Sequence, residues 1–181
     1  MAEDKQILLG GFGGQGIVLA GVILGYAAIN DGKWVAGSNS YGAAARGGAC
    51  QAGVVIGDEP VAFPHVTQAD IFVAMFQEAY DKFIDHVSHD GGIVIYDEQF
   101  VVPGEVSGVK YIGIPATRSA IEQVNNRMVA NVIMLGALVG VTGVVTEKAL
   151  VSAIRENSPK RFQESNLKAV NIGFELGKVR S

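Results

Sequence analysis

Apolar runs of two lengths alternate along the first part of the chain, separated by glycine-rich or polar turns. Residues 7–9 form a short apolar run before a glycine-rich turn, an aliphatic stretch covers 17–29, and 34–36 begin a second short run. This order predicts a strand, a turn, a helix and a second strand. Gly32 suits a left-handed cap at the end of the helix. The pattern predicts a βαβ unit that is complete by about Ser40.

The middle of the chain continues with apolar runs of strand length. Residues 49–56 contain β-branched side chains and end at the turn 57–60, after which 61–63 could return as the second strand of a hairpin. An amphipathic stretch over 78–87 predicts a helix. Two further runs, 70–74 and 92–96, are continuous enough for strands covered on both faces, and 109–114 supplies one more strand. A core sheet that is mostly parallel follows from these runs.

The C-terminal third has a helical pattern. Thr117 is a candidate N-cap, the apolar stretch 128–145 is long enough for a buried helix, and Thr146 favours a new helix start. Ser158 and Pro159 begin a last helix, which ends near residue 178. We therefore predict a single α/β domain over 1–181, Rossmann-like and three-layered, with a mostly parallel sheet and a helical C-terminal third.

Composition narrows the class of protein. A chain of 181 residues with 49% hydrophobic residues suits one domain with a real core. The formal charge is -4 and the basic residues are scattered, so nucleic acid is not an expected partner. The first six residues include acids and no apolar run, which predicts no signal peptide and a cytoplasmic location. Asn131, Thr142 and glycines interrupt 128–145, which favours a buried or interface helix over a membrane span.

Few side chains offer cofactor chemistry. Cys50 is the only cysteine and lies in an apolar run, so the chain cannot supply the four thiolates of a usual iron-sulfur cluster. His86 and His89 have acidic neighbours, but their setting is more typical of a solvated helix end than of a metal site. Asp97 and Glu98 follow a strand as adjacent acids, and we expect them on a loop surface.

The glycine-rich turn is the first candidate site. Its residues match the G-x-G-x-x-G pattern and are Gly11, Gly13, Gly14, Gln15 and Gly16. Backbone N–H groups between a strand and a helix can bind a phosphate, but the same glycines also permit tight turns and close packing. A dinucleotide fold also needs an acid near the end of the second strand, and 36–40 contains none. The motif by itself leaves both interpretations open.

The second candidate site is a stretch of small residues around one arginine. Its notable members are Ser40, Tyr41, Arg46, Gly47 and Gly48. A guanidinium flanked by glycines can offer a planar fork to a carboxylate or a phosphate. A surface salt bridge is the alternative role for Arg46.

Five stretches together resemble the gamma subunit of the 2-oxoacid:ferredoxin oxidoreductases. They are 11–16, 40–42 with 46–48, 58–60, 114–117, and 126–131 with 135–136. The paired glycines after Arg46 are more similar to 2-oxoglutarate-type members than to pyruvate-type members. The resemblance implies a complex that converts a 2-oxoacid and coenzyme A to acyl-CoA and CO2 while it reduces ferredoxin.

The resemblance also implies which chains of the complex bind the cofactors and what this chain contributes. Thiamine diphosphate, Mg and iron-sulfur clusters would be bound by alpha, beta and ferredoxin-like delta chains, and none by this chain. The glycine turn and Arg46 would contact an anionic group or a partner near the active site. Asn126, Arg127 and Asn131 would be structural or interface residues, and Gly136 and Gly140 would allow close packing of the apolar helix. Alternatives are the beta-type subunit of indolepyruvate:ferredoxin oxidoreductase and a free NAD-dependent dehydrogenase.

Overall fold

A computed structural model describes residues 4–40 and 48–181 of the chain. Its strands form one sheet in the order β2-β3-β1-β4-β5-β6. Their bounds are β1 Lys5–Phe12, β2 Trp34–Ser40, β3 Ala49–Gly57, β4 Ile71–Ala74, β5 Ile93–Asp97 and β6 Lys110–Ile114. Strands β1, β4, β5 and β6 pair in parallel, whereas β3 is antiparallel to both β1 and β2. The mostly parallel sheet is confirmed.

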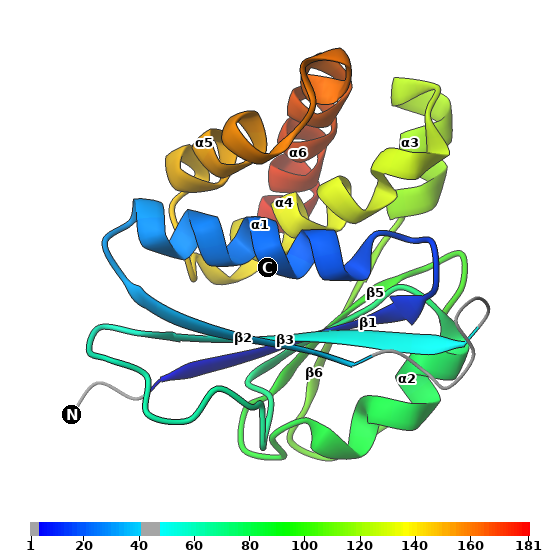
Figure 1. The fold of residues 1–181 in the computed structure, drawn as a ribbon. Helices are drawn as coiled ribbons and strands as arrows, with labels where there is room; N and C mark the ends of the chain where they lie inside the picture. Colours follow the sequence, from blue (N-terminus) through cyan, green and yellow to red (C-terminus); the bar gives the residue numbers. More distant parts are fainter. Residues whose placement is uncertain (1–3, 41–47) are drawn as a thin grey trace.

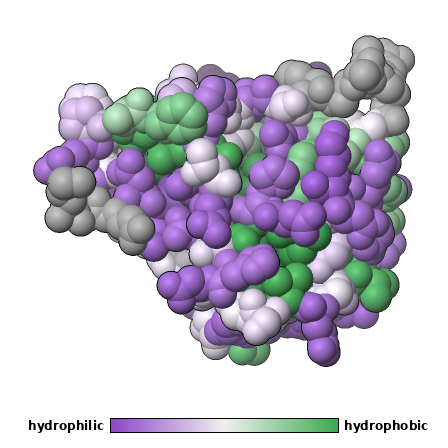
Figure 2. Space-filling model, turned by 90° about the horizontal axis from the view of Figure 1, so that it is seen from below, coloured by the Kyte–Doolittle hydropathy of each residue, from purple (hydrophilic) through white to green (hydrophobic). Residues whose placement is uncertain are grey.

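The helices divide unequally between the two faces of this sheet. Five of them, α1 and α3 to α6, lie on one face, and α2 lies on the other (Figure 1). Their bounds are α1 Ile17–Asn30, α2 Gln77–Phe83, α3 Ala116–Val124, α4 Ala130–Thr142, α5 Glu147–Asn157 and α6 Lys160–Arg180. Short 3-10 turns cover Ile84–His86 and Arg127–Val129. The three layers and the helical C-terminal third are as predicted, and the face seen from below is mostly polar (Figure 2).

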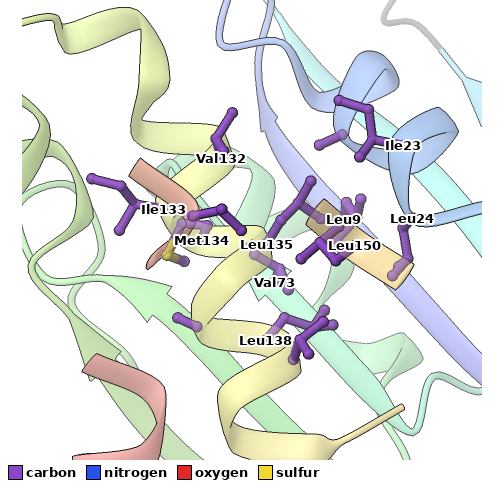
Figure 3. Close-up of a cluster of buried hydrophobic side chains, with 14 of the residues drawn as sticks. Leu9, Ile23, Leu24, Val73, Val132, Ile133, Met134, Leu135, Leu138 and Leu150 are labelled. Carbon is purple, nitrogen blue, oxygen red and sulfur yellow. The ribbon is translucent and has the colours of Figure 1, made fainter. Parts of the chain in front are cut away.

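The core lies between the sheet and the larger helical layer. Leu135 and Leu138 of α4 meet Leu9 of β1, Val73 of β4 and Leu150 of α5 (Figure 3). Every residue of α4 from 130 to 139 is buried. A helix that is apolar all round is a central helix, which explains why its pattern alone raised the question of a membrane. Within the described ranges, no helix has the length and hydropathy needed to cross a bilayer.

Glycines set the distance between α4 and α6. Gly136 and Gly140 of α4 face Gly173 and Gly177 of α6, and a methyl group on any of them would run into the backbone of the opposite helix. The close approach made by these glycines is therefore between two helices of this chain. The backbones of α4 and α6 therefore nearly touch. Helix α4 lies deep in the core, and its first turn lies at the edge of the sheet.

Several local expectations were wrong in detail. The predicted βαβ unit is split, because β3 lies between β1 and β2. No strand forms at 61–63, and the hairpin partner of β3 is β2 instead. Thr117 is not an N-cap, since α3 follows Pro115 and the Thr117 hydroxyl donates to Asp97. By contrast, the Thr146 hydroxyl accepts from the Ala149 N–H at 3.2 Å and caps α5 as predicted.

Candidate functional site

The glycine turn lies at the carboxyl edge of β1, where the chain enters α1. Gly14 and Gly16 have φ angles of 102° and 74°, in the left-handed region that favours glycine. Gly16 is the N-cap of α1 and has no side chain to bond the first turn of the helix. Within residues 4–40 and 48–181, the N–H groups of Gly14 and Gly16 meet no acceptor. The turn thus offers backbone donors beside a helix N-terminus, as an anion site requires.

Gln15 holds the turn in shape. Its Oε1 accepts a hydrogen bond from the N–H of Phe12 at 2.7 Å, and its Nε2 donates to the carbonyl of Met75 at 3.1 Å. Met75 follows β4, so this side chain joins the ends of two neighbouring strands. The polar atoms of Gln15 are therefore occupied within the chain, and its role is to position the turn.

Two segments far away in the sequence close around the turn. The carbonyl of Gly48 accepts from the N–H of Gly13 at 3.3 Å, because the start of β3 pairs with the end of β1. Asn131, only 6% exposed, donates from Nδ2 to the carbonyl of Gly16 at 3.2 Å. The glycine turn, the flank of the arginine segment and the start of α4 therefore meet at one edge of the sheet.

A cavity of about 290 Å³ opens at this meeting point. Its walls are mostly apolar or neutral, and Arg127 is the one charged residue among the described residues that line it. The lining residues are Phe12, Gly13, Gly14, Gln15, Met75, Thr117, Arg127, Met128, Ala130 and Asn131. Its position outside the carboxyl ends of parallel strands is where open α/β sheets bind ligands.

A buried carboxylate supports one wall of this cavity. Asp97, at the end of β5, is fully buried and accepts from the Thr117 hydroxyl at 2.6 Å and from the Thr117 N–H at 3.1 Å. It also accepts from the N–H of Gln99 at 3.1 Å. The expectation of a surface loop for Asp97 was wrong. Its position as the last residue of a buried strand was the signal that could have revealed it.

A larger cavity of about 550 Å³ lies at the opposite, amino edge of the parallel strands. Two pairs of charges occupy its rim: Lys5 lies 3.3 Å from Asp70, and Lys33 lies 3.6 Å from Asp58. A third acid, Asp90, also lines this cavity. Because this edge is not the one at which such sheets bind ligands, we place the candidate site at the glycine turn.

The other predicted residues fall into three groups. Tyr41, Arg46 and Gly47 lie outside the described residues. Ser40 ends β2 opposite Gln51. Asn126 begins the 3-10 turn before α4, where its Oδ1 accepts from the Met128 N–H at 3.0 Å.

Cofactor and metal chemistry finds little support in the described residues. Cys50 is buried, and burial raises the pKa of its thiol, which disfavours the thiolate needed for a metal bond. No group of three His, Cys, Asp or Glu residues gathers within 4–40 and 48–181. Strand β2 ends at Ser40 without an acid, and Asp31 instead accepts from the N–H and hydroxyl of Thr146, each at 2.6 Å. Among the described residues, no acid therefore lies at the end of β2, where a dinucleotide site holds the ribose.

The fold and the site define a Rossmann-like α/β domain with a glycine-turn cavity at its carboxyl edge. The chain belongs to the pyruvate ferredoxin/flavodoxin oxidoreductase family, to which residues 6–176 match. It is a subunit of a 2-oxoacid:ferredoxin oxidoreductase complex, and the resemblance to gamma subunits is confirmed.

Individual proteins give the same assignment. A 2-oxoglutarate synthase subunit KorC from Methanocaldococcus jannaschii is 46% identical over 96% of this chain and 94% of that protein. The crystal structure of a keto/oxoacid ferredoxin oxidoreductase gamma subunit from Geobacter sulfurreducens matches with a TM-score of 0.86 and 37% identity, over 97% of this chain and 99% of that one.

A larger enzyme contains the same fold. The 2-oxoglutarate:ferredoxin oxidoreductase from Magnetococcus marinus, with 2-oxoglutarate, coenzyme A and succinyl-CoA bound, matches with a TM-score of 0.89. The match covers 100% of this chain and 32% of that one at 24% identity, so it supports the fold alone. In that protein the fold is one part of a longer polypeptide.

Proposed function

We propose that residues 1–181 form the gamma subunit of a complex that oxidises 2-oxoglutarate. In this reaction the C1–C2 bond of the 2-oxoacid breaks, CO2 leaves, and C2 becomes the carbonyl of a thioester with coenzyme A. The two electrons released reduce ferredoxin. The observation that carries the choice of substrate is the 46% identity, over nearly the full length of both chains, to a 2-oxoglutarate synthase subunit.

The cofactors of this reaction belong to partner chains. Thiamine diphosphate with Mg supplies carbanion stabilisation, and iron-sulfur clusters carry the electrons. With one cysteine in the sequence, the gamma chain cannot ligate a four-thiolate cluster. We infer that alpha, beta and ferredoxin-like delta chains bind these groups. The chain described here contributes shape and binding contacts beside them.

In this proposal, the glycine-turn cavity is the part of this chain that lies beside the reacting substrates. The N–H groups of Gly14 and Gly16 meet no acceptor among the described residues, and next to the N-terminus of α1 they favour a negatively charged group there. Coenzyme A carries phosphates and 2-oxoglutarate carries carboxylates, so both offer such a group. The apolar walls suit the uncharged portion of the same molecule.

Arg46 stays part of this proposal although it lies outside the described residues. Gly48, two residues beyond it, bonds to Gly13 in the turn, so one flank of its segment reaches the site. Arg46→Lys should keep the charge but lose the bidentate geometry. We expect a raised KM for coenzyme A or the 2-oxoacid in an intact complex. Wild-type kinetics in both Arg46→Lys and Arg46→Ala would assign Arg46 to the surface.

Reconstitution of the complex tests the proposed function directly. The chain is co-expressed with its alpha, beta and delta partners, and coenzyme A-dependent reduction of ferredoxin is measured with 2-oxoglutarate, pyruvate, 2-oxoisovalerate and indolepyruvate. We expect the highest kcat/KM with 2-oxoglutarate. The isolated chain should be colourless and inactive. A higher kcat/KM with another 2-oxoacid would contradict the assigned substrate. Turnover by the isolated chain would contradict the proposal that partner chains bind the cofactors.

A further inference from the structure

A row of aromatic rings follows the carboxyl edge of the sheet. Phe12 ends β1, Phe76 follows β4, and Phe100 follows β5. The ring centroids of Phe12 and Phe76 are 5.2 Å apart, and those of Phe76 and Phe100 are 5.9 Å apart. Because β1, β4 and β5 are neighbours, three successive strands each place one half-buried ring at this edge of the sheet, and Phe12 lines the cavity. Each ring packs against the next, in the tilted arrangement that aromatic pairs favour.

Arg127 lies at the end of this row. Its guanidinium carbon is 5.5 Å from the centroid of the Phe100 ring, within the range of a cation–π contact. The residue stands on the 3-10 turn before α4, and it is exposed at the cavity rather than buried in the core. Stacking on the ring limits the orientations of the planar guanidinium, so less freedom is lost when it binds.

No acidic side chain neutralises Arg127 in the part of the chain that the structure describes. None of its ion pairs involves Arg127, and no carboxylate lines the cavity. The two acids at the end of β5 are engaged with other residues, Asp97 with Thr117 and Glu98 with Arg180. The cavity therefore carries one positive charge on its described wall.

The neutral polar side chains of the cavity are also engaged. The Oε1 and Nε2 atoms of Gln15 form hydrogen bonds to Phe12 and Met75. Asn131 donates a hydrogen bond to Gly16, and the Thr117 hydroxyl donates one to Asp97. Among the described residues that line this space, Arg127 is thus the only side chain with a charged donor. Five N–H groups in a planar fork match the geometry of a carboxylate or a phosphate.

We propose that Arg127 binds the anionic group of a substrate in the glycine-turn cavity and that Phe100 positions its guanidinium. The inference rests on the proposed function, since it takes the substrate from that reaction. The anion is a phosphate of coenzyme A or a carboxylate of the 2-oxoacid. Both share the same chemistry at the guanidinium, and separate kinetic measurements distinguish them. Arg127 is then a binding residue and not only an element of an interface.

The test uses the assembled complex with variants of the gamma chain. Arg127→Ala removes the charge, Arg127→Lys keeps the charge without the fork, and Phe100→Leu removes the stacked ring but keeps an apolar side chain. Arg161→Ala is the matched control, because Arg161 stacks on Phe162 at 4.6 Å on α6, away from the cavity. KM and kcat are measured for each substrate at two salt concentrations.

A direct contact predicts a selective change in KM. Loss of a charge-assisted bond should raise the KM of the bound substrate about tenfold to hundredfold in Arg127→Ala. Arg127→Lys should fall between that variant and wild type, and Phe100→Leu should raise the same KM by a smaller factor. The affected substrate identifies the anion. Its KM should also depend less on salt in Arg127→Ala, because one screened attraction is gone.

Three results would overturn the proposal. Wild-type KM values for both substrates in an active Arg127→Ala complex would remove Arg127 from the binding site. An equal rise in Arg161→Ala would show a general effect of surface charge. If Arg127→Ala, Arg127→Lys and a neutral, polar Arg127→Gln all fail to assemble, the role of Arg127 is structural.

The proposed function can fail independently. If the wild-type complex turns over none of the four 2-oxoacids, the proposed reaction is wrong. Calorimetric titration of the wild-type and Arg127→Ala complexes with coenzyme A and with 2-oxoglutarate then tests the binding role alone. Equal affinities in the two complexes would refute it, and weaker binding of one compound to the variant would support it.

Discussion

A methyl group on Gly140 should separate the two central helices. The Cβ of alanine at this position would lie 2.7 Å from the carbonyl oxygen of Phe174, 3.2 Å from the Cα of Gly177 and 3.3 Å from the amide nitrogen of Lys178. All three are backbone atoms, which cannot rotate away as a side chain can. Because ordinary Cβ contacts begin at 3.4 Å, α4 and α6 must move apart by about 0.7 Å.

Two opposing terms set the size of the effect. Overpacking costs about 1 to 3 kcal/mol, and the rigid backbone contacts place this position at the upper end. Alanine returns about 1 kcal/mol through its higher helix propensity. The net loss in the free energy of unfolding is about 2 kcal/mol, which lowers Tm by about 4 to 8 °C in a chain of this size.

Thermal and urea denaturation of the purified chain measure this change. Gly25→Ala is the matched control, because Gly25 is also helical but a methyl group there would meet only Val35, at 3.8 Å. We expect the control to raise the free energy of unfolding by about 0.5 to 1 kcal/mol. An increase in Tm for Gly140→Ala similar to that of the control would refute the close approach of α4 and α6.

Three further changes test other parts of the structure. Burial raises the pKa of Tyr111 to about 12, so folding favours the protonated hydroxyl. The free energy of unfolding should therefore fall as pH rises from about 10 through 12, and it should fall less in a Tyr111→Phe variant measured in parallel. Cys50 should react with a thiol reagent at pH 8 more slowly in the native chain than in urea, and equal rates would contradict its burial. Asp97→Ala should lower the free energy of unfolding by about 3 kcal/mol in urea denaturation, because buried donors of Thr117 lose their acceptor, whereas Asp97→Asn should cost less.

Strands and helices could be predicted from the sequence because their apolar runs are continuous and their ends are marked. The runs at 70–74, 92–96 and 109–114 correspond to β4, β5 and β6, and Thr146 correctly marked the start of α5. The strand order could not be predicted, because the place of β3 depends on pairing between distant segments. The buried position of Asp97 was missed because adjacent acids are usually solvated.

The candidate site was predictable only in part. The glycine turn is a local motif, so its place between a strand and a helix was visible in the sequence. Arg127 and Asn131 were expected to be structural or interface residues, and only the fold brings them to the turn, more than a hundred positions earlier in the chain. The aromatic row was invisible for the same reason, since its rings come from three separate strand ends.

The position of β3 between β1 and β2 also constrains the order of folding. Within the part of the chain that the structure describes, β2 pairs with β3 and not with β1, so α1 does not bring β2 directly onto β1. Contacts between strands close in sequence cost little chain entropy, and we expect the β2–β3 hairpin to form before it docks on β1. The bond from Gly13 to Gly48 can close only at that docking step. We therefore expect the glycine turn to reach its final shape late in folding, after β1, β2 and β3 have paired.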